Sequence, residues 1–181
     1  SIEIRYMKKI LLIGAGRSTS SLTQYLLFNA ENENWFITIA DQSKELASEA
    51  ANNHNNARAI AFDVNNEEER SRLIDEHDLI ISMLPAHMHM SVAKDCIKYK
   101  KHMATASYVS EEMKALDSEA KAAGIVMMNE IGVDPGIDHM SAMRVIDDIR
   151  DNGGELKAFE TFTGGLVAPE SDNNPWNYKF T

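Results

Sequence analysis

Short runs of apolar residues recur along most of the chain, and a stretch with helical spacing follows each run. The runs are too short for helices, and several are almost continuously apolar, as buried parallel strands must be. They lie at Ile10–Ile13, Phe36–Ala40, Arg58–Phe62, Leu79–Met83, His102–Ala106 and Ile125–Met128. Strands that alternate with helices favour right-handed crossovers. We therefore expect an α/β fold, a Rossmann-type doubly wound parallel sheet in the order 3-2-1-4-5-6.

The hydrophobic pattern changes near Ser141. Ser141–Asp151 predicts one more helix, and Glu155–Thr163 alternates polar and apolar residues as a half-exposed strand does. Three aromatic residues near the end match no predicted core: Trp176, Tyr178 and Phe180. This pattern predicts that a second domain has begun without being completed.

We accordingly expect three parts. Residues 1–6 are an upstream extension or a cloning remnant, and residues 7–140 form a dinucleotide-binding domain. Residues 141–181 are the truncated start of a second, α+β domain for substrate binding and dimerisation. On this interpretation the chain is a fragment that is inactive alone.

The first predicted strand runs into the glycine turn Gly14-Ala15-Gly16. Glycine suits position 14 because the turn is tight, and a side chain at position 16 would hold the backbone away from a pyrophosphate. The phosphates would rest on the amino end of the next helix, where Arg17 either pairs with them or is solvated. Thr19 replaces the third glycine of the dinucleotide fingerprint, which predicts a looser contact between helix and strand.

Asp41 closes the second predicted strand, where the fingerprint calls for an acidic residue. A carboxylate here can accept hydrogen bonds from both ribose hydroxyls of NAD(H), and it would repel the 2′-phosphate of NADP(H). The alternative is that Asp41 only caps the helix that follows.

Three later strands also end in polar or turn-forming residues, at the edge where α/β sheets bind ligands. Asp63-Val64 could face an adenine, Met83-Leu84-Pro85 lies on the path to the nicotinamide ribose, and Ser107-Tyr108 would lie near the reacting ring. Each has a simpler alternative, such as a turn at Asp63 or a satisfied hydroxyl at Ser107.

Ionisable residues gather after the sixth predicted strand. Glu130, Asp134, Asp138 and His139 follow it within eleven positions and form a candidate site. His139 could move a proton, or it could pack against the start of a helix.

Composition narrows the function further. A net charge of −10 argues against nucleic acid and anionic membranes as partners, and no apolar run is long enough to span a bilayer. The single cysteine, Cys96, fits a cytoplasmic protein and a buried thiol. We expect no metal site, because His87 and His89 are two residues apart instead of four.

Two long stretches resemble a known family. ATASYVSEEMKALDSEAKAAGIVMMNEIGVDPGIDHMSAM, from Ala104, and TGGLVAPESDNNPWNYKF resemble the glutamate-forming saccharopine dehydrogenases, also called saccharopine reductases. GAGRSTS, Asp63-Val64 and SMLP extend the resemblance more weakly toward Lys8. It implies an oxidoreductase of lysine metabolism that uses NADP(H). The reaction is the reversible reduction, to saccharopine, of the imine formed from glutamate and 2-aminoadipate 6-semialdehyde.

The resemblance also implies roles for individual residues. Asp134 would hold the substrate ammonium and stabilise positive charge on the reacting nitrogen, and His139 is a candidate proton carrier. Substrate contacts fall at Ser107, Tyr108 and Asp134. Nucleotide contacts fall at Ser18, Thr19, Asp63, Val64, Met83, Val133 and Pro135.

Two other functions remain open at this point. One is a related imine reductase of the carboxynorspermidine or lysine 6-dehydrogenase type, and the other is a nucleotide-binding module without catalysis. The choice between NADP(H) and NAD(H) also stays open, and a homodimer is possible.

Overall fold

The computed structural model describes residues 6–162 and residue 170. The chain divides into two compact units, residues 1–140 and residues 141–181. Trp176, Tyr178 and Phe180 lie outside the described residues.

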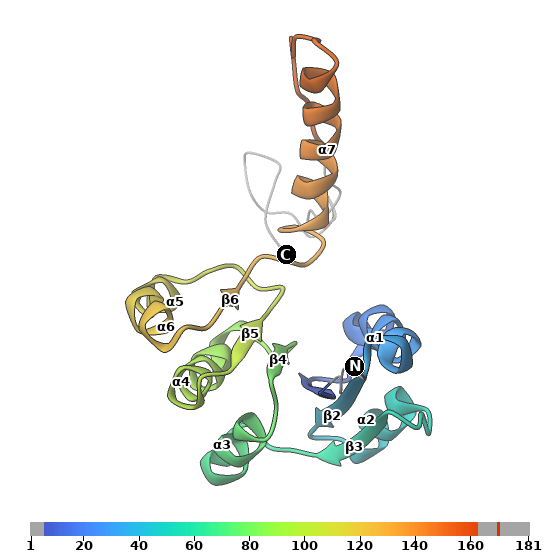
Figure 1. The fold of residues 1–181 in the computed structure, drawn as a ribbon, viewed down its shortest axis with the longest axis vertical. Helices are drawn as coiled ribbons and strands as arrows, with labels where there is room; N and C mark the ends of the chain where they lie inside the picture. Colours follow the sequence, from blue (N-terminus) through green and yellow to red (C-terminus); the bar gives the residue numbers. More distant parts are fainter. Residues whose placement is uncertain (1–5, 163–169, 171–181) are drawn as a thin grey trace, which may run out of the picture. The chain divides into compact units, whose positions relative to one another are not determined.

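The first unit is built on a six-stranded parallel sheet in the order β3-β2-β1-β4-β5-β6 (Figure 1). The predicted fold class and strand order are therefore confirmed. The strands are β1 (Lys8–Ile13), β2 (Trp35–Asp41), β3 (Ala57–Ala61), β4 (Leu79–Ser82), β5 (His102–Ala104) and β6 (Met127–Met128).

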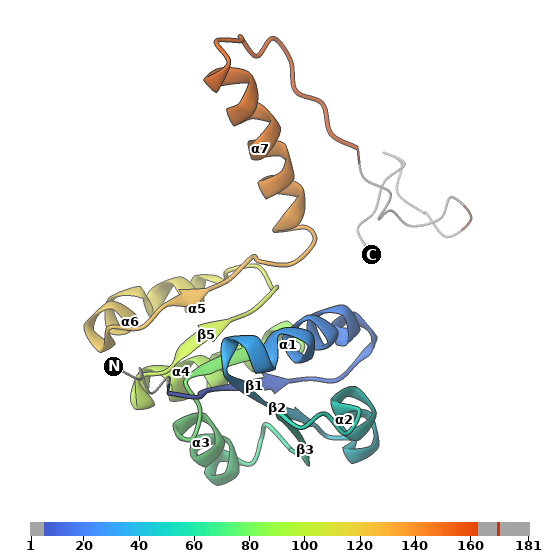
Figure 2. The ribbon, with the colours of Figure 1, turned by 45° about the vertical axis from the view of Figure 1, so that its right-hand side comes forward.

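Helices cover the sheet from both sides (Figures 1 and 2). One side carries α1 (Ser20–Glu33) and α2 (Lys44–Ala51). The other carries α3 (Glu67–Asp75), α4 (His89–Tyr99), α5 (Glu111–Ala115) and α6 (Asp117–Ala123). A further helix, α7, spans Ile137–Asp151. No helix in the described part of the chain is long and apolar enough to cross a membrane.

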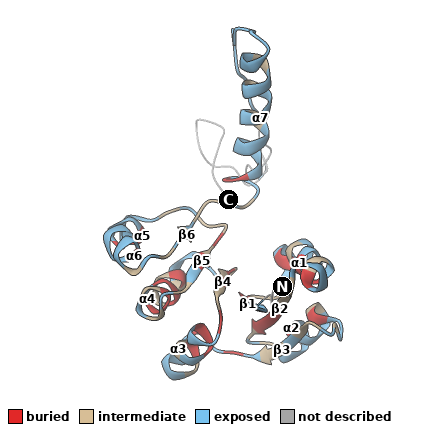
Figure 3. Ribbon diagram, in the orientation of Figure 1, coloured by how far each residue is buried: buried red, intermediate tan, exposed pale blue. Residues whose placement is uncertain are grey.

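Two hydrophobic cores form, one on each face of the sheet. Successive side chains of a strand point to opposite faces, so β1 contributes Ile10 and Leu12 to the core under α1 and α2, and Leu11 and Ile13 to the other. Buried positions accordingly concentrate in the central strands and on the inner faces of the helices (Figure 3). Cys96 belongs to the second core, and burial raises the pKa of its thiol to about 12, as expected for a structural cysteine.

Local sequence signals set the helix ends. The side chains of Ser43, Asn66 and Ser110 cap α2, α3 and α5 by accepting a backbone N–H in the first turn. The helices α1 and α2 end at asparagines in the left-handed conformation, which asparagine tolerates better than most residues.

One predicted element is wrong. Glu155–Thr163 was expected to be a strand, but residues 155–162 are exposed and form neither strand nor helix. A strand needs a partner to satisfy its N–H and C=O groups, and the described residues provide none beside this segment. The predicted helix at Ser141–Asp151 is present, but it begins earlier, at Ile137.

A buried histidine ties α3 to the centre of the sheet. Nδ1 of His77 lies 2.6 Å from the Leu73 carbonyl oxygen, which can only accept, so Nδ1 carries the hydrogen. Nε2 therefore accepts from the Thr38 hydroxyl at 2.7 Å, and Thr38 in turn accepts from Nε of Arg58 at 3.0 Å. Burial, together with the Arg58 charge, lowers the pKa of His77 below its usual 6.5.

We predict that the free energy of unfolding falls as the pH drops below about 6.5. The unfolded chain binds a proton at His77 more readily than the folded one, so the stabilisation is complete above that value and is lost as the pH falls through the lowered pKa. Urea unfolding at pH 7.5, 6.5 and 5.5 measures this. His77→Gln should reduce the slope of this pH dependence, leaving the part due to the other buried histidine, His89. His87→Gln, at an exposed position in the 3-10 turn before α4, should leave the slope unchanged. Equal slopes in both variants would refute the assignment.

Candidate functional site

The glycine turn after β1 touches the end of β4. Gly14 has a φ of +108°, and a Cβ there would lie 3.1 Å from the Met83 carbonyl oxygen. The N–H groups of Gly14 and Met83 donate to Ala40 and Ile13, which fixes three strand ends against one another. No residue but glycine suits position 14.

Position 16 is constrained differently. A Cβ on Gly16 would meet no atom within 4 Å, so the protein itself does not demand glycine there. The Gly16 carbonyl accepts both the N–H and the hydroxyl of Thr19, at 3.0 and 2.7 Å. Thr19 is buried and completes the 3-10 turn Arg17–Thr19 that leads into α1, while Arg17 and Ser18 are exposed.

Both carboxylate oxygens of Asp41 bind backbone. Oδ2 accepts the Ala15 N–H and Oδ1 accepts the Ser43 N–H, each at 2.8 Å. The cap of α2 is the Ser43 hydroxyl, so the alternative that Asp41 itself caps this helix is wrong. Asp41 instead links the turns after β1 and β2.

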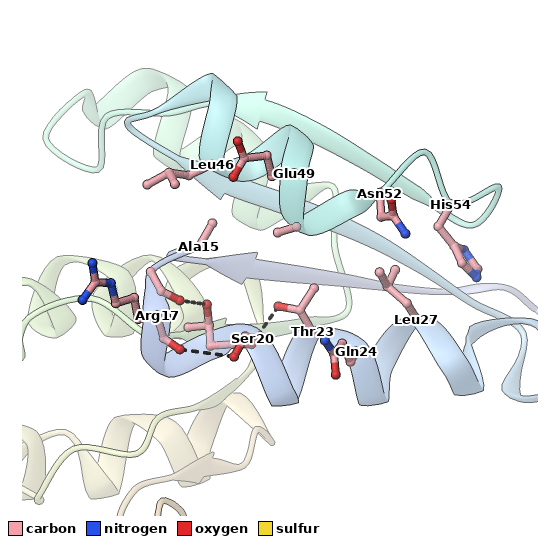
Figure 4. A pocket seen from close by; sticks show the side chains of 13 residues that line it. Ala15, Arg17, Ser20, Thr23, Gln24, Leu27, Leu46, Glu49, Asn52 and His54 are labelled. Carbon is pink, nitrogen blue, oxygen red and sulfur yellow. Dashed lines mark hydrogen bonds between the residues drawn. The ribbon is translucent and has the colours of Figure 1, made fainter.

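A cleft of about 190 Å³ lies beyond the carboxyl ends of the central strands. Five of the predicted cofactor residues line it: Gly14, Asp41, Val64, Leu84 and Pro85. A larger cavity of about 640 Å³ lies between α1 and α2 and includes Gly16, Arg17 and Thr19 (Figure 4). We take the smaller cleft as the candidate site, because nucleotides bind at the strand ends of such sheets.

The segment after β3 forms one wall of this cleft. Oδ1 of Asp63 accepts from the Asn65 backbone and side chain, so the predicted alternative of a turn at Asp63 is present. Val64 is buried, and its carbonyl accepts from Arg70 at 2.7 Å. Nε of Arg70 also donates to the carboxylate of Asp95 at 2.7 Å, which joins α3 to α4.

Glu130 clamps the loop that follows β5. Its N–H donates to the Ser107 carbonyl, and its side chain accepts the Val109 N–H, both at 3.1 Å. Ser107 is half-buried and Tyr108 is exposed. The two bonds hold the Ser107-Tyr108 loop beside the chain that leaves β6.

The next turn, Gly132–Gly136, packs on the same loop. A Cβ on Gly132 would lie 2.9 Å from Cβ of Ala106. The Gly132 N–H donates to the Pro135 carbonyl at 2.8 Å, and its own carbonyl accepts from Ile137. Gly136 has a φ of +143°, and a Cβ there would lie 2.2 Å from the Gly132 oxygen. Glycine is therefore required at position 136.

Three ionisable side chains meet at the start of α7. Ligand atoms of Asp134, Asp138 and His139 lie within 4.8 Å of one another, and all three residues are exposed. Exposure argues against the packing role considered for His139. Burial alone would raise the pKa of Asp138, but hydrogen bonds from His139 and Gly136 outweigh it, and the pKa is lowered. Because exposed acidic groups often cluster without a metal, we assign none.

Sequence reasoning missed one buried group. His89, at the start of α4, is 3% exposed. Its Nδ1 lies 2.9 Å from the Ser82 hydroxyl, and its Nε2 lies 2.7 Å from the Ser107 hydroxyl and 3.2 Å from that of Thr105. Burial, with a smaller effect of His87, lowers the pKa of His89. The sequence does contain a signal for this group, because His89 closely follows one strand that ends in a serine and precedes another that is followed by a threonine and a serine. His89 was considered only as a possible metal ligand together with His87.

Comparison with known families identifies two matches. Residues 10–128 match the saccharopine dehydrogenase NADP binding domain, and residues 132–181 match the saccharopine dehydrogenase C-terminal domain. A saccharopine dehydrogenase [NADP(+), L-glutamate-forming] from Schizosaccharomyces pombe is 43% identical over 97% of this chain and 38% of its own length. An alpha-aminoadipic semialdehyde synthase from Arabidopsis thaliana is 36% identical over 99% of this chain and 18% of its own length.

Solved structures agree with these matches. An apo saccharopine dehydrogenase (L-Glu forming) from Saccharomyces cerevisiae has a TM-score of 0.76 at 36% identity, over 96% of this chain and 38% of that one. A 3-ketoreductase, KijD10 from Actinomadura kijaniata, has a TM-score of 0.59 at 17% identity, over 83% of this chain and 46% of that one. At that identity the likeness concerns the fold alone.

We predict that Gly136→Ala lowers the free energy of unfolding by at least about 3 kcal/mol, because strain adds to a clash with the Gly132 backbone. Gly124→Ala is the matched control. Gly124 also has a positive φ, +71°, but its Cβ would meet no atom within 4 Å, so a loss of only about 1–2 kcal/mol is expected. Urea unfolding measures both, and equal losses would contradict the described turn.

Proposed function

The chain belongs to the saccharopine dehydrogenase family, and we propose that it forms the cofactor-binding part of an enzyme that interconverts saccharopine with glutamate and 2-aminoadipate 6-semialdehyde. In the oxidative direction a carbon–nitrogen single bond becomes an imine, and water then splits the imine into an amine and an aldehyde. NADP(H), when bound, takes up or supplies the hydride of this reaction.

One observation carries the proposal. The Glu130 clamp holds Ser107-Tyr108 against the turn that bears Asp134, and the Gly14 turn lies against Met83 at the end of β4. The residues proposed to bind substrate and cofactor thus follow the carboxyl ends of neighbouring strands. This is where α/β enzymes bind a nucleotide and its reaction partner.

The residues at the glycine turn, beside the cleft, fit a dinucleotide. No atom of the chain lies within 4 Å of the position that a Cβ on Gly16 would take, and this open space leaves room for a pyrophosphate. The amino end of α1 favours anions, and the exposed Arg17 adds a positive charge beside it. Further proposed nucleotide contacts are Ser18, Thr19, Asp63, Val64, Met83, Leu84, Pro85, Val133 and Pro135.

We propose NADP(H) as the preferred cofactor. Asp41 was the argument for NAD(H), but both of its oxygens already accept backbone N–H groups. Fewer lone pairs of the carboxylate are therefore left to accept hydrogen bonds from the ribose hydroxyls. Arg17 offers a positive charge for a 2′-phosphate. The fungal relatives are named as NADP(+) enzymes, which is consistent with this choice.

Asp134 is proposed to hold the substrate ammonium and to stabilise positive charge on the reacting nitrogen. Ser107 and Tyr108 are proposed to contact substrate, and His139, bonded to Asp138 at 2.7 Å, is a candidate to carry a proton during imine formation. The chain spans 38% of the length of the fungal relatives it matches. Groups that bind the remaining substrate carboxylates are expected in the rest of such a protein.

We predict that Gly16→Ala weakens NADPH binding by about tenfold or more, because the added methyl group occupies the pyrophosphate path. Its effect on the free energy of unfolding should stay within about 1 kcal/mol, since the Cβ meets nothing in the folded chain. Calorimetric titration of the 181-residue chain with NADPH, and separately with NADH, measures the affinities.

Gly124→Ala provides the reverse control, with lower stability and unchanged NADPH affinity. Unchanged NADPH binding by Gly16→Ala would disprove the assigned phosphate site. A wild-type chain that binds NADH more tightly than NADPH would disprove the proposed cofactor preference.

We also predict that the full-length protein carrying this sequence oxidises saccharopine with NADP⁺. Asp134→Asn should lower kcat/KM by at least about tenfold, since a hydrogen bond between charged groups contributes about 1.5–3 kcal/mol. The affinity for NADPH should not change. Turnover of carboxynorspermidine or lysine in place of saccharopine would indicate a related imine reductase, and cofactor binding without turnover of any of these would indicate a non-catalytic module.

A further inference from the structure

His89 connects two strand ends through its ring. Nδ1 contacts the hydroxyl of Ser82, the last residue of β4, and Nε2 contacts the hydroxyl of Ser107, in the loop after β5. Ser82 is fully buried, His89 is nearly so, and Ser107 is half-buried. A path of hydrogen bonds therefore leads from the core to a hydroxyl at the edge of the site.

The ring is held in its neutral form. Burial lowers the pKa of His89, so near neutral pH one ring nitrogen donates and the other accepts. Among the described residues, Nδ1 is the only hydrogen-bond partner of the Ser82 hydroxyl. A buried hydroxyl that donates to nothing is costly. The buried Thr105 hydroxyl could donate to Nε2, but it lies 3.2 Å away, whereas Ser82 lies 2.9 Å from Nδ1, so the shorter contact favours donation from Ser82 to Nδ1.

The remaining contacts follow from that direction. With Nδ1 accepting, the hydrogen lies on Nε2, which donates to Ser107 at 2.7 Å and faces Thr105 at 3.2 Å. The Ser107 oxygen is then fixed in place, and its own hydrogen is left to point away from His89. A hydroxyl presented in this way can donate to an anion.

We propose that His89 is a positioning residue, which holds the Ser107 hydroxyl as a hydrogen-bond donor for a carboxylate of the substrate. This assignment rests on the proposed function, in which Ser107 contacts an amino-acid substrate. His89 itself does not touch the substrate. It determines which way the serine hydroxyl is turned, and so contributes to substrate affinity more than to the chemical step.

The tautomer is the first test, and it does not depend on activity. Long-range proton–nitrogen correlation spectra of the chain with ¹⁵N-labelled histidine distinguish a hydrogen on Nε2 from one on Nδ1. The chain has six histidines, and loss of one set of signals in His89→Gln assigns them. A neutral ring with the hydrogen on Nε2 is expected near pH 7. A hydrogen on Nδ1, or a doubly protonated ring, would overturn the proposal.

The second test is kinetic and uses the full-length protein. His89→Asn retains a polar group near the Nδ1 position but cannot reach Ser107, so KM for saccharopine should rise about tenfold, with kcat little changed and NADPH affinity unaltered. His89→Gln places an N–H donor near the Nε2 position and should restore much of the affinity. His87→Asn, at an exposed position two residues away, should leave KM unchanged.

A double-mutant cycle decides whether His89 acts through the serine. In a Ser107→Ala background, His89→Asn should add less than about a twofold change in KM. If His89→Asn instead raises KM by the same factor with and without Ser107, the two residues act independently. That result would indicate a role of His89 in folding alone and would refute the positioning role. Absence of saccharopine turnover by the wild-type protein would instead refute the proposed function, while the tautomer measurement would still stand or fall on its own.

Discussion

The site depends on the reversal of strand order between β1 and β4. From β1 the chain builds β2 and β3 toward one edge of the sheet, and from β4 it builds β5 and β6 toward the other. The loops after β1 and β4 therefore diverge to opposite faces and leave a crevice between them. Gly14 can lie against the backbone of Met83 only because these two strands are neighbours.

The sequence was sufficient to predict the architecture, since each buried strand appears as a short apolar run between turn signals. It overestimated strand lengths where the pairing partner is short. The run Ile125–Met128 is apolar throughout, yet only Met127 and Met128 pair with β5. The predicted strand at Glu155–Thr163 was wrong for the same reason. Alternating polar and apolar residues suit a strand that is exposed on one face, but they do not show that a neighbouring strand is present to pair with it.

The candidate site was predicted only in part. Residues that follow strands could be placed at one edge of the sheet from topology, but their hydrogen bonds could not. The sequence predicted a ribose contact for Asp41 but not that its carboxylate bridges two backbone turns, nor that the carboxylate of Glu130 holds a loop. His89 was missed because its two partners come from different strand ends: Ser82 closes β4, and Ser107, 18 residues after His89, is brought beside the ring only when β5 pairs with β4. Such contacts depend on side-chain geometry, which the hydrophobic pattern of the sequence does not predict.

The two glycines of the first turn bear on how such chains diverge over evolutionary time. Position 14 is closed to other residues by the fold itself, whereas position 16 is open in the folded chain. A copy released from selection for cofactor binding would therefore keep the first glycine and drift at the second. A related chain that has lost only the second glycine is therefore expected to keep the fold and to have lost cofactor binding.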